Sequence, residues 1–378
     1  MRLLIAPDKF KGTFTAAQIC DLLSRGIREE KPHWQIDAQP LADGGEGTMD
    51  AILGAVGGAC VPSTTRGPMG VPHEASWGLT HEGTAVFESA VFLGLHLVPP
   101  AQRSPLRASS RGLGEAIAAA LESGVRRFLV GLGGVATVDG GLGMAAALGY
   151  RLEDAGGRPL EGCARDLDAL ANVDASMAHP ALAQARFTAL CDVSHPLIGP
   201  QGAARVFGPQ KGATPDEVSR LDEGLRRLAR ILAGWKGVPP EVLTSMPMGG
   251  AAGGLGVGTA SFLNASLEPG AIFLMRLLLS PGRLEGADLV VTGEGSLDEQ
   301  TSGGKVAAAI LGRAALGGRP VVVVTGRWDG TLPAPRPAVV EVLGPGMGKE
   351  GLLETADLVE VGRELARRAE GLAKRAAG

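Results

Sequence analysis

The sequence predicts an α/β protein with two domains, one of them built on a parallel sheet, and three observations support this prediction. Short runs of Val, Ile and Leu end at Gly, Asp or Ser and alternate with helical patterns along the chain. Its 378 residues exceed the usual size of one domain. Aromatic residues make up 4% of the chain and hydrophobic residues 45%, which is typical of parallel sheets covered by Ala- and Leu-rich helices.

The alternation of strands and helices begins at the first residue. Residues 1–6 predict a strand, and the apolar stripe of residues 15–30 predicts a helix that starts at Thr15. Further strands are predicted at residues 35–41, 71–79, 84–89, 127–130, 186–193, 287–291 and 320–324. Further helices are predicted at residues 49–56, 217–235 and, capped by Ser109 or Ser110, up to residue 122; residues 149–160 predict a β-hairpin.

The simplest organisation of these elements is a parallel-sheet domain formed by both ends of the chain, with a mixed α/β domain inserted into it. The predicted strands 71–79 and 84–89 alternate in polarity, as strands of an antiparallel or mixed sheet do. We assign residues 1–62, 105–147 and 285–378 to the parallel-sheet domain, and residues 63–104 and 148–284 to the inserted domain.

Charge and hydropathy exclude several classes of protein. The net charge is −4 and no Lys/Arg cluster resembles a nucleic-acid footprint, so we expect no nucleic-acid partner. No uninterrupted apolar run reaches 18 residues and no secretory leader precedes the first strand, so we expect a cytoplasmic protein without membrane association. The four cysteines lack metal-ligand or redox spacing, and we expect no disulfides.

Acidic residues stand beside glycines at the carboxyl ends of several predicted strands. They are Asp8, Asp43 with Glu46, Asp139, Asp192, and Glu294 with Asp298. In open parallel sheets the ligand crevice lies at that edge, where carboxylates suit divalent-metal binding or deprotonation of a hydroxyl. One such residue can equally be a helix cap or a turn residue, but five loops at one edge favour a functional site.

Lysines and glycines form a complementary set. Lys9 and Lys11 follow the first strand, Lys211 lies in Gly-Pro-Gln-Lys-Gly, and Lys305 follows Ser-Gly-Gly. A lysine in a Gly-rich loop is a candidate counter-charge for phosphate, although a solvated surface lysine is the ordinary alternative. Glycines of residues 131–143 and 249–256 can bring main-chain N–H groups close to anionic oxygens.

Two familiar nucleotide motifs do not account for these loops. The chain has no G-x-x-x-x-G-K-[ST] sequence, which excludes an ordinary P-loop enzyme. Residues 141–146 fit G-x-G-x-x-A formally, but they do not directly follow a strand and lack the later acidic residue that binds a ribose. A nicotinamide dehydrogenase is therefore a distant alternative, and no Ser-His-Asp or Cys-His arrangement supports a hydrolase.

Together the loops resemble the type I glycerate kinase family. The resemblance rests on seven segments in the family's order and spacing. They are Pro-Asp-Lys-Phe-Lys-Gly-Thr at 7–13, Pro-Leu-Ala-Asp-Gly-Gly-Glu-Gly-Thr at 40–48, Gly-Leu-Gly-Gly-Val-Ala-Thr-Val-Asp-Gly-Gly at 131–141, Cys-Asp-Val-Ser-His-Pro-Leu at 191–197, Val-Phe-Gly-Pro-Gln-Lys-Gly-Ala at 206–213, Gly-Ala-Ala-Gly-Gly-Leu-Gly at 250–256 and Thr-Gly-Glu-Gly-Ser-Leu-Asp-Glu-Gln-Thr-Ser-Gly-Gly-Lys at 292–305.

The resemblance implies a fold and a reaction. The fold is a flavodoxin/Rossmann-like parallel-sheet domain joined to a second, mixed-sheet α/β domain, with the active site in the cleft between them. The reaction is phosphorylation of D-glycerate by ATP with Mg²⁺, giving 2-phosphoglycerate, by a monomer or homodimer. Open alternatives are a kinase that makes 3-phosphoglycerate or acts on another small hydroxy acid, and an organic-acid sensor without turnover.

On this resemblance we assign roles to individual residues, since phosphoryl transfer needs positioning and charge neutralisation. The expected catalytic residues are Asp192 as the base, Lys11, Asp8 and Asp43. The expected ATP-binding residues are Gly133, Gly134, Asp139, Gly140, Lys211, Gly253, Gly254 and Lys305. The expected metal ligands are Glu46, Glu294 and Asp298.

The sequence departs from the family pattern at three positions, and the segment beyond Lys305 also lacks the family's usual proline. Val135 and Val138 stand where the family usually has Ser and Asn, so each loses a polar group. His195 stands where Asn is usual, and it can still form hydrogen bonds.

Overall fold

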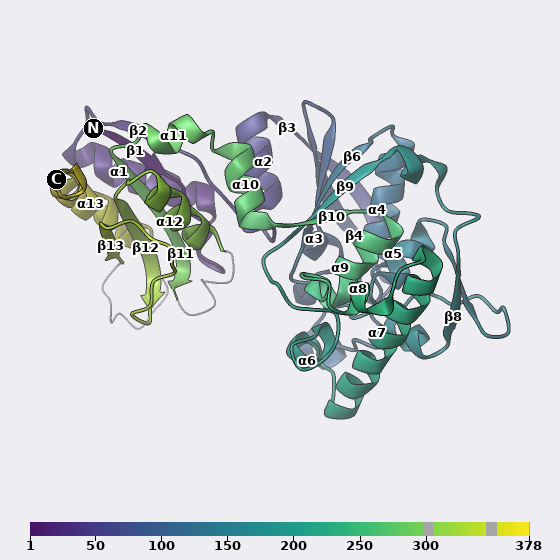
Figure 1. The fold of residues 1–378 in the computed structure, drawn as a ribbon. Helices are drawn as coiled ribbons and strands as arrows, with labels where there is room; N and C mark the ends of the chain where they lie inside the picture. The colour runs from purple at the N-terminus through teal and green to yellow at the C-terminus, as the bar shows by residue number, and fades with distance from the viewer. Residues whose placement is uncertain (298–304, 345–353, 378) are drawn as a thin grey trace. The chain divides into compact units, whose positions relative to one another are not determined.

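A computed structural model describes residues 1–297, 305–344 and 354–377, which form two compact units (Figure 1). The first unit comprises residues 1–43, 50–55 and 269–378, and the second comprises residues 44–49 and 56–268. Every helix in the described part of the chain is too short or too polar to cross a membrane.

The first unit contains one sheet of five strands. In chain order the strands are β1 (Arg2–Ile5), β2 (Gln35–Ala38), β11 (Leu289–Leu297), β12 (Val321–Trp328) and β13 (Val340–Leu343). Its helices are α1 (Ala16–Glu30), α2 (Thr48–Val56), α10 (Gly270–Leu278), α11 (Pro281–Glu285), α12 (Val306–Leu316) and α13 (Thr355–Ala377). The strands are all parallel in the order β13-β12-β11-β1-β2, so both ends of the chain build this sheet.

Helices α1 and α13 lie side by side in the first unit (Figure 1). Gly26 makes this approach possible, because a Cβ there would lie 2.0 Å from the carbonyl oxygen of Val359. The buried side chains of Leu23 and Leu365 pack with alternate strand residues such as Val291 into one core. Local signals also fix α1, since Thr15 and the side chain of the third helical residue form a capping box.

The second unit is larger and contains a six-stranded sheet and a small two-stranded one. Its strands are β3 (Gly58–Arg66), β4 (Pro72–Thr80), β5 (Thr84–Glu88), β6 (Arg127–Leu132), β7 (Arg151–Asp154), β8 (Leu170–Asp174), β9 (Arg186–Cys191) and β10 (Ser266–Pro269). Its α-helices are α3 (Ser89–Leu93), α4 (Arg111–Glu122), α5 (Leu142–Ala147), α6 (Ala203–Phe207), α7 (Pro215–Lys236), α8 (Pro240–Thr244) and α9 (Ala251–Phe262).

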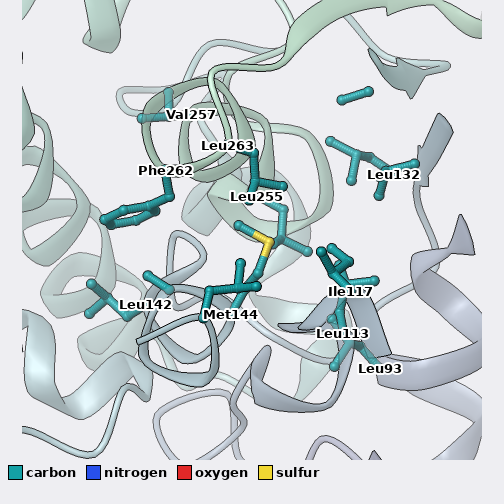
Figure 2. Close-up of a cluster of buried hydrophobic side chains, with 14 of the residues drawn as sticks. Leu93, Leu113, Ile117, Leu132, Leu142, Met144, Leu255, Val257, Phe262 and Leu263 are labelled. Carbon is teal, nitrogen blue, oxygen red and sulfur yellow. The ribbon is translucent and has the colours of Figure 1, made fainter. Parts of the chain in front are cut away.

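The six-stranded sheet is mixed, in the order β10-β9-β6-β5-β4-β3. Strands β3, β4 and β5 pair antiparallel, whereas β5, β6 and β9 pair parallel. The apolar side chains of this unit form one continuous core. Figure 2 shows part of it, where Met144 lies near Leu255 and Leu263, with Leu113 and Ile117 of α4 on another side.

The structure confirms the mixed α/β class, and its two compact units differ from the predicted domains at several boundaries. Residues 105–147 were expected in the parallel-sheet domain, but β6 pairs with β5 and β9 in the six-stranded sheet, so this segment belongs to the second unit. Residues 56–62 also belong to the second unit, and residues 269–284 belong to the first. An apolar run such as β6 suits the interior of either sheet, and only strand pairing decides between them.

Candidate active site

In the first unit, the end of β1 and the loop after β2 bring two aspartates to one lysine. The Nζ atom of Lys9 lies 3.9 Å from Oδ1 of Asp8 and 3.8 Å from Oδ1 of Asp43. All three side chains are largely shielded from solvent, with 17% exposure for Lys9 and less for both aspartates. Two of the sequence-predicted catalytic residues thus share one counter-ion.

Asp8 has an unusual protonation equilibrium. Burial, together with the negative charge of Asp43, raises the pKa of its carboxyl from 3.8 to about 8, although Lys9 works in the opposite direction. A carboxyl with a pKa near the working pH can exchange a proton during catalysis. Glu294 also raises the pKa of Asp8, which places a third carboxylate in the same electrostatic environment.

Glu294 reaches this group through the pairing of β1 with β11. The main-chain N–H of Asp8 donates to the carbonyl oxygen of Gly293 at 2.8 Å, which fixes the two strand ends side by side. The Oε2 atom of the buried Glu294 lies 3.3 Å from Nζ of Lys305. Lys305 is the N-cap residue of α12 and is partly exposed. The first unit therefore gathers three carboxylates and two ammonium groups at one sheet edge.

Two predicted site residues, Lys11 and Glu46, are not part of this group. Lys11 lies on an exposed turn, whereas Lys9, which our assignment of roles left out, bridges the aspartates. Glu46 is exposed and belongs to the second unit. Asp298 lies outside the described residues. Both lysines follow β1 in the sequence, and no local signal decided which one would turn toward the carboxylates.

In the second unit, Asp139 is the centre of a buried hydrogen-bond network. Its carboxylate accepts bonds from the main-chain N–H and the hydroxyl of Ser110, both at 2.7 Å, and from the N–H groups of Gly141 and Gly143, both at 3.2 Å. Burial nevertheless raises the pKa of this carboxyl. Ser110 stands at the N-cap position of α4 as expected, but its hydroxyl serves Asp139 instead of capping the helix.

Lys211 is buried beside this network. It is 4% exposed, and its Nζ donates to the carbonyl oxygen of Thr137 at 2.8 Å. Desolvation lowers the pKa of its ammonium group from 10.5 to about 7, while the charge of Asp139 acts to raise it. In the described structure the ammonium therefore holds the glycine-rich loop 131–143 from within the protein.

The glycines of the two Gly-rich segments pack backbone against backbone. A Cβ on Gly253, which has a φ of 71°, would lie 2.0 Å from the carbonyl oxygen of Thr137. A Cβ on Gly254 would lie 3.0 Å from Cα of Gly140, whose N–H donates to the carbonyl oxygen of Gly253 at 3.1 Å. The close contact of these segments explains their glycine content.

Some N–H groups predicted to bind anionic oxygens have protein acceptors. Gly133 donates to the hydroxyl of Ser89 at 3.1 Å, and Gly140 donates to Gly253. These two N–H groups thus have protein acceptors in this structure, and their donation to phosphate stays a prediction. A role of Gly134, Gly253 and Gly254 in binding ATP stays a prediction.

Asp192 follows β9 in a loop that contacts the start of α9. The main-chain N–H of Gly250 donates to the carbonyl oxygen of His195 at 3.0 Å. The Nδ1 atom of His195 lies 2.9 Å from the carbonyl oxygen of Gln201, and its ring meets the ring of Phe207 edge-on. The histidine is thus a local hydrogen-bonding group, and the loop that carries the half-buried Asp192 is tied down on both sides.

The other two departures from the family pattern have a packing role. Val135 is 2% exposed and Val138 is fully buried, and both belong to the hydrophobic core of the second unit. A polar side chain at either position would need an internal partner, so valine is consistent with this packing.

The carboxylates of the first unit suit a magnesium ion. Among the residues that the structure describes, no three His, Cys, Asp or Glu side chains are spaced to hold a metal by themselves. Mg²⁺ is usually bound by one or two carboxylates together with phosphate oxygens and water. Asp8, Asp43 and Glu294, which share one electrostatic environment, satisfy that smaller requirement.

Fold and site thus define an α/β protein of two units whose strand-end loops concentrate carboxylates, lysines and glycines. A family model described as "Glycerate kinase family" matches residues 3–375, and the chain belongs to this family. It is therefore an enzyme, a glycerate kinase that uses ATP as phosphoryl donor.

Individual relatives agree with this assignment. The chain is 39% identical to a glycerate 2-kinase of Escherichia coli strain K12 and 40% identical to a glycerate kinase of Halalkalibacterium halodurans; each alignment covers 86% of this chain and 85% of the relative. It also resembles the crystal structure of a putative glycerate kinase 2 from Salmonella typhimurium LT2. That match has a TM-score of 0.84 and 37% identity, and it covers 99% of this chain and 98% of the other.

Proposed function

We propose that this glycerate kinase transfers the γ-phosphoryl group of ATP to the 2-hydroxyl of D-glycerate with the help of Mg²⁺. The choice of the 2-hydroxyl is supported by the similarity to the Escherichia coli protein, which carries the name glycerate 2-kinase. Bond formation is between the hydroxyl oxygen and the γ-phosphorus, and the bond to the β,γ-bridging oxygen breaks, so that ADP and 2-phosphoglycerate leave.

The charged group of the first unit is suited to the metal and to part of the phosphate charge. One or two of the carboxylates of Asp8, Asp43 and Glu294, together with phosphate oxygens, would hold Mg²⁺, which would neutralise charge on the transferred phosphoryl group. Lys305, 3.3 Å from Glu294, and the exposed Lys11 are positioned at the surface of this unit and can neutralise triphosphate or the glycerate carboxylate. Lys9 would hold the two aspartates in their orientation.

Asp192 is our proposed general base for the glycerate hydroxyl. It directly follows β9, and a main-chain bond from Gly250 at the start of α9 to His195 holds its loop. Asp8 is the second candidate, because its raised pKa places its titration near neutral pH. The two candidates lie in different units and can be substituted independently.

The buried network of the second unit is suited to positioning. Asp139 and Lys211 hold the loop 131–143 in place through hydrogen bonds with Ser110 and Thr137. Because the loop is already ordered, it can present its remaining polar groups to a ligand without losing conformational entropy at each turnover. In this proposal Lys211 acts on ATP through the loop that it holds.

The decisive experiment is a product analysis. The purified enzyme is incubated with ATP, Mg²⁺ and D-glycerate, and ³¹P NMR identifies the phosphoglycerate isomer. Formation of 2-phosphoglycerate supports the proposal, and accumulation of 3-phosphoglycerate contradicts it. A parallel reaction with L-glycerate and tartronate measures the preference for the acceptor, and omission of Mg²⁺ is expected to abolish the signal.

A further inference from the structure

The second unit has an arginine-lined cavity that the kinase mechanism does not use. Its volume is about 430 Å³, within the range of small-molecule sites. It lies between the turn that joins β3 to β4, the segment that leads into α4, and residues 161–165 of the connection from β7 to β8. The polar side chains in its wall are Arg66, Arg107, Ser109, Arg111, Glu161 and Arg165.

The charges around this cavity are not balanced. Arg165 pairs with Glu161, and Arg66 pairs with Glu115 of α4 at 3.6 Å. Within the described part of the chain, the guanidinium groups of Arg107 and Arg111 have no carboxylate or carbonyl partner. The exposed Arg107 and the half-buried Arg111 thus form no ion pair, although the buried carboxylate of Asp166 accepts from the N–H groups of Gly162 and Cys163 in the same wall.

The wall near Ser109 is fixed in place. Its hydroxyl donates to the carbonyl oxygen of Gly162 at 2.6 Å and accepts from the N–H of Arg111 at 3.3 Å. The next residue, Ser110, is bound to Asp139. Helix α4 begins at this wall, and the carboxylate of Asp139 already accepts from the N–H of its N-cap residue Ser110. These bonds hold the wall of the cavity in place.

We propose that this cavity is a second ligand site and binds a small phosphate monoester. Two unpaired guanidinium groups complement a dianion, and a phosphate monoester carries between one and a half and two negative charges at neutral pH. The planar fork of arginine matches phosphate oxygens with two hydrogen bonds at once. A monocarboxylate such as glycerate would leave one of the two charges uncompensated.

The test uses calorimetric titration of the full-length enzyme with glycerol 3-phosphate, inorganic phosphate and lactate, each in the presence of a non-hydrolysable ATP analogue and Mg²⁺. The variant R107A/R111A removes the unpaired charges. The variant R151A/R186A removes two exposed arginines of the same unit that lie outside the cavity, and it controls for net charge. The comparison of these variants does not depend on turnover, so it stays informative if the proposed acceptor is wrong.

We expect glycerol 3-phosphate to bind the wild type and the control variant alike, more tightly than lactate does. R107A/R111A should weaken this binding by at least about tenfold, since each charge-assisted bond is a strong one. R107K/R111K keeps both positive charges and should bind glycerol 3-phosphate with an affinity between those of the wild type and R107A/R111A. Binding by this variant shows that substitution at the two positions leaves the protein folded. The proposal would be overturned if the wild type did not bind glycerol 3-phosphate, if R107A/R111A bound it as tightly as the wild type, or if the control variant lost as much affinity as R107A/R111A. If inorganic phosphate bound more tightly than glycerol 3-phosphate, the ligand would not be a phosphate monoester.

Discussion

The ammonium group of Lys211 donates a hydrogen bond to the carbonyl oxygen of Thr137, 2.8 Å away, inside the second unit. This bond joins the short Gly-Pro-Gln-Lys-Gly segment to the glycine-rich loop after β6. Asp139, two residues after Thr137, contributes the opposite charge. The stability of the loop therefore depends on a charged pair that is shielded from water.

We predict that Lys211→Met destabilises the protein by about 3 kcal/mol, because it leaves the buried carbonyl oxygen of Thr137 and the carboxyl of Asp139 without their polar partner. The free energy of unfolding is measured by denaturant titration. Lys236→Met is the matched control, since its ammonium also donates to a carbonyl oxygen but is exposed; it should cost less than about 1 kcal/mol. If the double variant D139N/K211M costs the full sum of the two single changes, the residues are not coupled.

The pKa of Lys211 gives a prediction about pH. It is 10.5 in the unfolded chain and about 7 in the folded one, so the unfolded chain binds more protons between these values. The contribution of Lys211 to the free energy of unfolding should therefore rise with pH from about 7 to 10.5. Unfolding of the wild type and Lys211→Met is compared across this range. A constant difference between the two proteins would contradict the lowered pKa.

The raised pKa of Asp8 should give the opposite pH dependence of the free energy of unfolding. Its folded pKa of about 8 lies above the unfolded value of 3.8, so the stability from its bound proton is fully present below pH 3.8 and is lost as the pH rises toward 8. The variant Asp8→Asn should show a flatter decline in this window. Asp21→Asn, an exposed position on α1, is the control and should follow the wild type. An unchanged slope in Asp8→Asn would refute the assignment.

Gly253 tests the close contact between the two glycine-rich segments. We expect Gly253→Ala to destabilise the protein by about 2 kcal/mol or more, since a Cβ would meet the carbonyl oxygen of Thr137 at 2.0 Å and the φ of 71° disfavours alanine. Gly234→Ala in α7 has no atom within 4 Å of the new Cβ, so it should be neutral or slightly stabilising. Thermal unfolding of both variants measures the contrast. Equal melting temperatures would contradict it.

Asp192 tests the proposed base. Asp192→Asn should lower kcat by roughly 10²–10⁴ while the circular dichroism spectrum stays that of the wild type. Glu82→Gln, an exposed residue of the β4–β5 turn, should keep full activity. If Asp192→Asn retains the wild-type kcat and Asp8→Asn does not, Asp8 is the better candidate. The pH–rate profile of the active variant then shows whether an ionisation near pH 8 persists.

Much of the fold could be predicted because its signals are local. The apolar stripe and the capping box of α1 are both readable within 16 residues, and the long amphipathic α7 likewise begins at a capping box. The polarity of the runs that became β11 and β12 indicated a buried parallel sheet, and their pairing confirms it. The domain boundary near β6 was wrong, because the partners of a strand lie far away in sequence.

For the candidate site, the sequence by itself determined which residue types meet at the strand ends: Asp8, Asp43 and Glu294 share one environment, as the parallel strands require. Only the tertiary structure decided how they are used. It placed Lys9 and not Lys11 between the aspartates, and it buried Lys211 against Thr137. The physical reason is that hydration, burial and strand pairing depend on contacts between distant segments, and these contacts set whether a charge meets solvent, substrate or another side chain.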